Sequence, residues 1–174
     1  MGKIVKLLAK YYPVYLSGLW GTLWISAVTV LLGLVLGMLV ALMRMSRSKL
    51  LNAVSGVYIE VLRGTPILLQ LYFFWIGLPK LVPFELSDTQ CIVVALAVNA
   101  SAFISEIIRA GILAVDGGQN EAARSLGLSS WQSMKLVVLP QAIKNILPAL
   151  GNEFVTVIKE SSIVSVIGLA DLMF

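Results

Sequence analysis

Residues 11–43 read YYPVYLSGLWGTLWISAVTVLLGLVLGMLVALM and contain no Asp, Glu, Lys or Arg. A helix needs only about 20 consecutive apolar residues to cross a lipid bilayer. The apolar core of a secretory signal peptide is shorter, about 7–15 residues, and is followed by a small-residue cleavage site. We therefore expect residues 11–43 to form a transmembrane helix that the mature protein retains.

The composition of the whole chain also favours a membrane protein. The 174 residues are 59% hydrophobic and 13% charged, whereas soluble domains are about 25% charged, so a water-soluble fold is disfavoured. The formal net charge is +4, and the basic residues are scattered between apolar stretches. This scatter favours contacts with anionic lipid headgroups over a nucleic-acid interface.

The chain offers few groups for catalysis. It has no histidine and a single cysteine, Cys91, which lies inside an apolar run. Histidine is the commonest general base and a common metal ligand, so we expect no catalytic residues and no metal site, and we interpret Cys91 as a packing residue. A phosphate-binding loop of the G-x-x-x-x-G-K-[ST] type is also absent, so ATP hydrolysis by this chain is not expected.

Three further apolar stretches follow the first, and they predict an all-α, polytopic membrane protein with four visible spans in a single domain, residues 1–174. The second stretch covers residues 54–78, the third residues 89–112 and the fourth residues 147–169. Glu106 and Arg109 lie one helical turn apart near the end of the third stretch, so we expect a structural ion pair there.

Residues 114–140 are too polar to span and are expected to form a structured loop. A turn-rich approach over residues 116–120 precedes a short helical run, residues 121–126, and then Gly127. Ser129 and Gln132 have the spacing of a capping box, which predicts that a new helix begins there. We expect Pro140 and Pro148 to interrupt that helix.

Charge counting leaves the orientation in the membrane open. Arg44, Arg47 and Lys49 place the first loop in the cytoplasm by the positive-inside rule. The N-terminal segment carries Lys3, Lys6 and Lys10 and is equally basic.

Three segments, in order along the chain, carry a family resemblance. Glu121-Ala122-Ala123 with Gly127, Leu139 and Pro140 resembles the EAA signature of ABC importer permeases, and Gly118-Gln119 in front of it is typical of the polar amino acid permease family. The other two segments are Arg63-Gly64-Thr65-Pro66, and Asn152-Glu153-Phe154 continuing to Lys159-Glu160-Ser161-Ser162. The likeness extends from about Gly18 to the C-terminus.

The resemblance implies a type I ABC importer permease of the bacterial inner membrane, with five spans and an external N-terminus. We therefore expect a fifth span to follow Phe174 shortly, and both basic loops to be cytoplasmic. The implied partners are ATPase subunits that bind ATP and Mg, an extracytoplasmic solute-binding protein, and a second permease, which is either an identical copy or a sister chain. The chain itself then has no cofactor, and its substrate is a polar amino acid, with basic amino acids among the candidates.

In this family the loop forms a coupling helix that docks in a groove of the ATPase. The residues expected to couple are Glu121, Ala122, Ala123, Ser125, Leu126 and Gly127. The two alanines keep the helix compact, and Gly127 permits a tight turn because glycine tolerates positive backbone angles. Glu121 is expected to favour the helix dipole or to pair with a basic group of the partner.

The fourth span carries the candidate substrate site. Glu153, Thr156 and Glu160 recur at helical spacing and would line one face with oxygen acceptors. A charge inside a bilayer costs about 2.5–3.5 kcal/mol on insertion scales, so Glu153 needs a partner or a wet cavity. We predict a mid-membrane pocket centred on Glu153 and Asn99, with Gln70 contributing hydrogen bonds. The alternative is that Glu153 pairs with Lys159 or with a neighbouring span.

Two features remain open to more than one interpretation. Gly33, Gly37 and Ala41 form a small-xxx-small pattern that lets a second helix approach closely, either within the subunit or between subunits. Glu153 would also suit a proton- or sodium-coupled secondary transporter as its titrating group, and a membrane anchor without a transport path is a third possibility.

Overall fold

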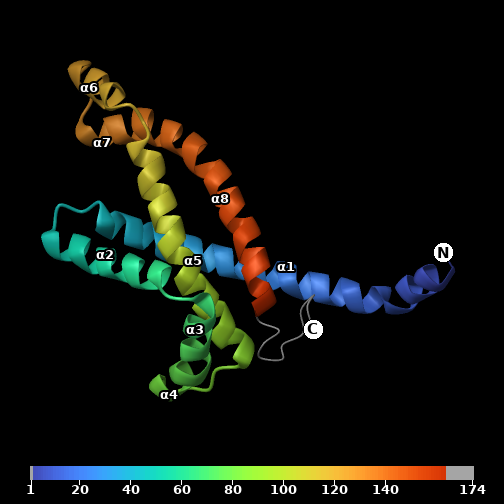
Figure 1. The fold of residues 1–174 in the computed structure, drawn as a ribbon. Helices are drawn as coiled ribbons and strands as arrows, with labels where there is room; N and C mark the ends of the chain where they lie inside the picture. Colours follow the sequence, from blue (N-terminus) through green and yellow to red (C-terminus); the bar gives the residue numbers. More distant parts are fainter. Residues whose placement is uncertain (1, 164–174) are drawn as a thin grey trace.

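The computed structural model describes the backbone of residues 2–163 and the side chains of residues 10–163. All regular elements in this range are helical, which confirms the all-α prediction (Figure 1). In chain order they are α1 (Gly2–Arg44), α2 (Lys49–Gly64), α3 (Ile67–Tyr72), the π-helical turn Phe73–Gly77, α4 (Leu78–Leu81), α5 (Asp88–Leu113), α6 (Gly117–Ser125), α7 (Ser130–Ser133), the π-helical turn Met134–Val138, and α8 (Leu139–Ser161).

Two helices of the described range are long and apolar enough to cross a membrane by themselves. They are the Lys10–Arg44 part of α1 and the whole of α5. They contain the predicted first span, residues 11–43, and the predicted third span, residues 89–112. The long apolar runs were sufficient to place both helices, because a single segment in lipid satisfies all of its own backbone groups only as a helix.

The predicted second span, residues 54–78, contains a sharp bend. α2 and the helical segment Ile67–Leu81 meet at an angle of 107°. Thr65 has an extended backbone, with φ −110° and ψ 143°, and Pro66 follows with ψ 135°. Proline disfavours helical geometry in the residue before it and donates no backbone N–H, so the helix stops at Gly64 and a new one starts after Pro66.

The predicted fourth span also differs from the structure. α8 begins at Leu139 and runs without a break through Pro148 to Ser161. Pro140 follows directly on the π-helical turn Met134–Val138, and the helical backbone continues from that turn into α8, so neither proline ends the helix. The end of the predicted span, residues 164–169, lies outside the described residues. Within residues 2–163, two helices, or three if the bent pair is one span, meet the length and composition of a span.

Small residues bring the long helices close together. Gly33, Gly37 and Ala41 are buried along one side of α1, and a Cβ atom on Gly37 would lie 2.8 Å from Cγ2 of Ile104 and 2.9 Å from the carbonyl oxygen of Ser101. The small-residue pattern of α1 therefore packs against α5 within the subunit. Gly111 of α5 is in similarly close contact with Ile146 of α8.

The described residues form two clusters of buried apolar side chains along α5. One cluster joins Ile25 of α1 and Leu71 of α3 to Ile92 and Leu96 of α5, and the other joins Ala100 and Ile104 of α5 to Val157 of α8. Figure 1 shows α5 running from the end that carries α3 and α4 to the opposite end, where α6 and α7 project away from α1.

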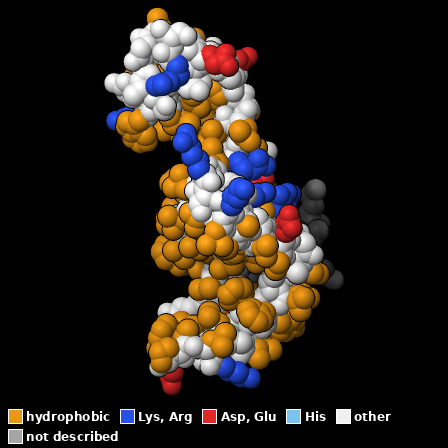
Figure 2. All heavy atoms as spheres, turned by 90° about the vertical axis from the view of Figure 1, so that its left-hand side faces the viewer, with side chains coloured by type: hydrophobic (Ala, Val, Ile, Leu, Met, Phe, Trp, Pro, Cys, Tyr) orange, Lys and Arg blue, Asp and Glu red, His pale blue; other side chains and the backbone are white. Residues whose placement is uncertain are grey.

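Much of the remaining surface is apolar. Trp20, Leu31 and Leu42 of α1 are 71%, 67% and 64% exposed. Figure 2 shows hydrophobic side chains over most of the middle and lower parts of the visible face, and a largely polar upper end. An apolar belt with a polar end is the surface expected of a chain embedded in a bilayer.

Candidate functional site

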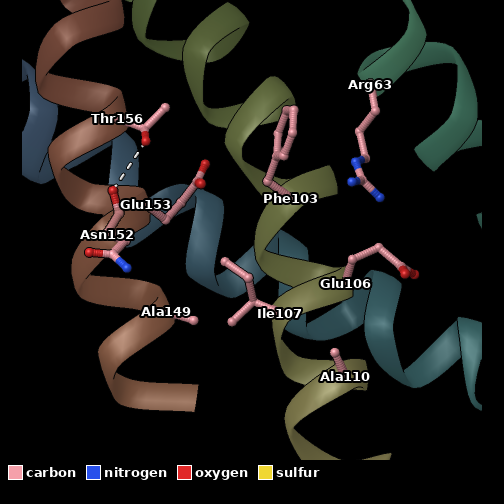
Figure 3. Close-up of a pocket in the computed structure, with 9 residues that line it drawn as sticks. All are labelled: Arg63, Phe103, Glu106, Ile107, Ala110, Ala149, Asn152, Glu153 and Thr156. Atoms are coloured by element: carbon pink, nitrogen blue, oxygen red, sulfur yellow. Dashed lines mark hydrogen bonds between the residues drawn. The ribbon is translucent and has the colours of Figure 1, made fainter. Parts of the chain in front are cut away.

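A cavity of about 490 Å³ opens between the C-terminal end of α2 and the facing sides of α5 and α8. Figure 3 shows the side chains around it. The lining residues are Arg63 of α2, Phe103, Glu106, Ile107 and Ala110 of α5, and Ala149, Asn152, Glu153 and Thr156 of α8.

Opposite charges enter this cavity from different helices. In Figure 3, Phe103 and Ile107 lie between Arg63 on one side and Glu153 on the other. Cζ of Arg63 lies 5.2 Å from the centroid of the Phe103 ring, a distance at which the ring face attracts the cation. The cavity thus combines an apolar floor with one cationic wall and one anionic wall.

The third charged residue of the lining already has its partner. Arg109 donates from Nε to one carboxylate oxygen of Glu106 at 2.9 Å and from Nη2 to the other at 2.6 Å. This two-point contact confirms the predicted ion pair and neutralises Glu106. It is the one salt bridge among residues 10–163, so Glu153 forms none with Lys159 or any other described residue.

The predicted acceptor face of α8 lies only partly in the cavity. Glu153 and Thr156 line it, together with Asn152, whose carbonyl oxygen accepts from the Thr156 hydroxyl at 3.1 Å. Glu160 lies about two turns beyond Glu153, is half-buried, and is not among the lining residues.

The structure does not bring Asn99 or Gln70 to the cavity. Both are buried, and Nδ2 of Asn99 donates to Oε1 of Gln70 at 3.0 Å. Nε2 of Gln70 lies 2.8 Å from the Leu62 carbonyl oxygen and 3.1 Å from that of Thr65. These are backbone acceptors at the break between α2 and α3, so the pair ties that break to α5. The predicted pocket centre on Glu153 and Asn99 is therefore not present in this geometry.

Of the cavity lining, the sequence reasoning assigned only Glu153 and Thr156 to the substrate site. It left out Arg63 and Phe103, which supply the cationic wall and the ring beside it. Phe103 follows Asn99 by four residues and precedes Glu106 by three, so helical spacing puts it on the same side of α5. Arg63 lies inside the predicted second span, and a charge there needs a partner or water. Its position in the sequence therefore also pointed to a polar cavity.

The polar loop folds into two short helices beyond the end of α5. α6 starts at Gly117, where the Asp116 side chain caps it by accepting from the Gly118 N–H at 2.6 Å. The predicted turn over residues 116–120 is thus mostly helix, because an aspartate cap outweighed the two glycines that follow it. The predicted capping box of Ser129 and Gln132 is present and starts α7.

Gly127 ends α6 as predicted. Its φ is +85°, the one positive φ in the described chain. The Gly127 N–H donates to Arg124 O at 3.1 Å and the Leu128 N–H to Ala123 O at 3.2 Å. These two bonds form a Schellman motif, which requires the left-handed conformation that glycine adopts at little cost.

The α6–α7 unit is fixed on one side and exposed on the other. Ala123 is buried, and the buried Ser133 hydroxyl lies 2.7 Å from Oδ1 of Asn120, joining α7 to α6. Glu121, Ala122 and Ser125 are exposed, and Leu126 is 82% exposed. The unit lies at the end of α5 that is distant from α3 and α4 (Figure 1).

The sequence that folds into this arrangement matches a known protein family. The family described as "Binding-protein-dependent transport system inner membrane component" matches residues 33–174. The chain belongs to this family. The resemblance inferred from the EAA-like segment is thereby confirmed, and the chain is a permease subunit of the ABC importer type.

Individual relatives agree with the family. This permease is 47% identical over 161 residues to the "Arginine transport system permease protein ArtQ" of Bacillus subtilis (strain 168), covering 92% of this chain and 74% of that protein. It is 43% identical to the "Putative glutamine transport system permease protein GlnP" of Rickettsia prowazekii (strain Madrid E), covering 95% of this chain and 78% of the relative.

Solved structures confirm the importer permease fold. A chain of an "amino acid ABC transporter with histidines" superposes with a TM-score of 0.89 at 52% identity, covering 95% of this permease and 77% of that chain. A chain of the MetNI methionine ABC transporter, in an inward-facing conformation, gives a TM-score of 0.78 at 24% identity, which supports the fold alone.

Proposed function

We propose that this permease carries polar L-amino acids inward across the bacterial inner membrane by alternating access, powered by a separate ATPase subunit. Arginine and glutamine are the first candidates, because the similar permeases are named for them. In this proposal the chain forms a single transmembrane domain and has no catalytic residue, metal or cofactor of its own.

The observation that carries the proposal is the unpaired carboxylate of Glu153 in a cavity among membrane helices. Glu153 lines the cavity and forms no salt bridge with a described residue. A charge at this depth is costly unless it faces water or a counter-charge. The ammonium group common to all amino acids, or a cationic side chain, supplies that counter-charge, and Thr156 adds a hydroxyl beside it.

The α6–α7 unit is the proposed contact for the ATPase. A docking surface must be exposed and must be rigidly connected to the moving helices. The exposed residues of the unit are Glu121, Ala122, Ser125 and Leu126. The rigid connection comes from buried Ala123 and from the Schellman motif at Gly127. ATP and Mg are then bound by the ATPase, a solute-binding protein delivers the amino acid, and a second permease, identical or sister, completes the translocation path.

Reconstituted transport tests this function. The permease is extracted from its native membrane in mild detergent, the co-purifying subunits are identified by mass, and the complex is placed in liposomes with the binding protein. Uptake of labelled arginine or glutamine is expected to require ATP and to persist when ionophores remove proton and sodium gradients. Uptake driven by an ion gradient without ATP would instead support a secondary transporter.

A further inference from the structure

The cavity holds two charges of opposite sign that lack an ion-pair partner among the described residues. Glu153 enters from α8 and Arg63 from α2. The remaining acidic residue of the lining, Glu106, is held by Arg109 through two hydrogen bonds. The carboxylate next to Arg63 is therefore already occupied by another guanidinium.

Arg63 is also short of hydrogen-bond acceptors. Arg63 is exposed, its guanidinium lies over the face of the Phe103 ring, and no described group accepts a hydrogen bond from it. A guanidinium carries five N–H donors in a planar fork that matches a carboxylate. In a chain embedded in lipid, such a group must meet water or an anionic ligand.

The space between the two charges suits a small ligand with an apolar middle. Phe103 and Ile107 line the cavity between Arg63 and Glu153 (Figure 3), and Ala149 adds an apolar group on the α8 side. The cavity of about 490 Å³ is in the range of small-molecule sites, about 300–1,000 Å³. A ligand with a negative group at one end and a positive group at the other would satisfy both walls at once.

We propose that Arg63 binds the α-carboxylate of the transported amino acid, while Glu153 binds a cationic group of the same molecule. This inference rests on the proposed function and narrows its substrate class. The cavity selects amino acids that keep a free carboxylate and rejects the corresponding decarboxylated amines, since an amine leaves the Arg63 guanidinium without an anion.

Direct binding to the purified permease–ATPase complex tests the proposal without the selectivity of the binding protein. The probes are L-arginine with agmatine, and L-glutamine with 4-aminobutanamide, so that each amino acid is compared with its decarboxylated counterpart. In the wild type, at least one amino acid is expected to bind about tenfold or more tightly than its amine, as a charge-assisted, two-point hydrogen bond would provide.

Two variants separate the roles of the two walls. Arg63→Gln is expected to weaken binding of the amino acid by about tenfold and to leave binding of the amine unchanged, so that the preference disappears. Unchanged amine binding also shows that the variant is folded. Glu153→Gln is expected to weaken both probes alike. Lys144→Gln, which removes an exposed positive charge of α8 outside the cavity, is expected to keep the wild-type preference.

The outcomes distinguish this inference from the function on which it rests. An Arg63→Gln complex that still prefers the amino acid by the wild-type factor would overturn the role of Arg63 and leave the importer intact. If that variant does not fold, Arg63→Lys serves in its place, with a reduced preference expected and an unchanged one counting against the proposal. A wild-type complex that binds no amino acid would reject the cavity as a substrate site altogether.

Discussion

At the scale of single residues, the charge of Glu153 is the most informative feature of the permease. It is half-buried in the cavity lining, and no described cation neutralises it. Substituting glutamine for Glu153 removes the charge and preserves the shape of the side chain. A change in transport by this variant therefore reports on electrostatics and not on packing.

Glu153→Gln is expected to raise the substrate concentration needed for half-maximal uptake by about tenfold or more, because a hydrogen bond to a charged group is worth about 1.5–3 kcal/mol. The measurement is ATP-dependent uptake in proteoliposomes. Glu60→Gln removes an exposed carboxylate of α2 outside the cavity and should leave uptake unchanged. Full uptake of every amino acid tested by Glu153→Gln would show that Glu153 does not contact substrate.

Gly127 is a second residue whose geometry makes a prediction. Its φ of +85° strains any residue with a Cβ atom, by about 1–3 kcal/mol. Gly127→Val is expected to lower the amount of substrate carried per ATP hydrolysed, because the turn that fixes α6 is distorted. Gly127→Asn should be milder, since asparagine visits this backbone region most readily among the other residues. If both variants carry as much substrate per ATP hydrolysed as the wild type, the turn has no role in coupling.

At the scale of elements, the contact between α1 and α5 depends on the absence of a side chain. An added Cβ at Gly37 would lie 2.8 Å from Ile104 and 2.9 Å from the backbone of Ser101. A backbone atom cannot move aside as a flexible side chain can, so the helices must separate. Overpacking of this kind typically costs about 1–3 kcal/mol.

Gly37→Ala is therefore expected to lower the midpoint of thermal unfolding of the detergent-solubilised complex. The matched control is Gly151→Ala, because nothing lies within 4 Å of a Cβ atom added there. That control should leave the midpoint unchanged or raise it slightly, since alanine is the better helix former. Equal midpoints for the two variants would mean that α1 and α5 are not this closely packed.

The break between α2 and α3 depends on the buried Asn99–Gln70 pair. Gln70→Leu would leave the Asn99 amide group and backbone oxygens of the break without their partner, and each unsatisfied buried group costs about 1–3 kcal/mol. A double-mutant cycle with Asn99→Leu is expected to show coupling of about 0.5–3 kcal/mol in unfolding free energy. Strictly additive effects would show that the two amides do not cooperate.

At the scale of the whole molecule, the orientation in the bilayer decides whether the coupling proposal is possible. α6 and α4 lie near opposite ends of α5 (Figure 1). A cytoplasmic ATPase can reach α6 only if that end faces the cytoplasm. The single cysteine, Cys91, is buried, so an introduced cysteine is readily distinguished by labelling.

Glu121→Cys is expected to react with a membrane-impermeant maleimide in inside-out vesicles and not in intact cells. Glu85→Cys, in the loop between α4 and α5, should show the opposite pattern. Bound ATPase is expected to slow the labelling of Glu121→Cys and to leave the labelling of Glu85→Cys unchanged. Labelling of this position from the outside of intact cells would place α6 beyond the reach of the ATPase and would contradict the proposed coupling.

The sequence by itself determined the features that depend on local chemistry. The apolar runs located α1 and α5, the Ser129–Gln132 spacing located the start of α7, and Gly127 marked a left-handed turn. The EAA-like segment identified the family, which the match over residues 33–174 confirmed. Backbone satisfaction in lipid, capping and glycine geometry all act within a few residues, so a linear pattern suffices to find them.

The tertiary structure alone decided which side chains meet. In the sequence, each of three polar residues lies in an apolar stretch and could equally line a pocket: Asn99, Gln70 and Glu153. In the structure, Asn99 donates a hydrogen bond to Gln70, and Glu153 faces Arg63 across the cavity. That choice follows from the rotation of α5 and α8 about their axes and from the 107° bend after Gly64. The helix rotations and the bend are set by close contacts between segments that are distant in the sequence, such as Gly37 with Ile104 and Gly111 with Ile146. The spacing of residues along one helix does not specify which neighbouring helix it will contact, so these contacts could not be predicted from the sequence.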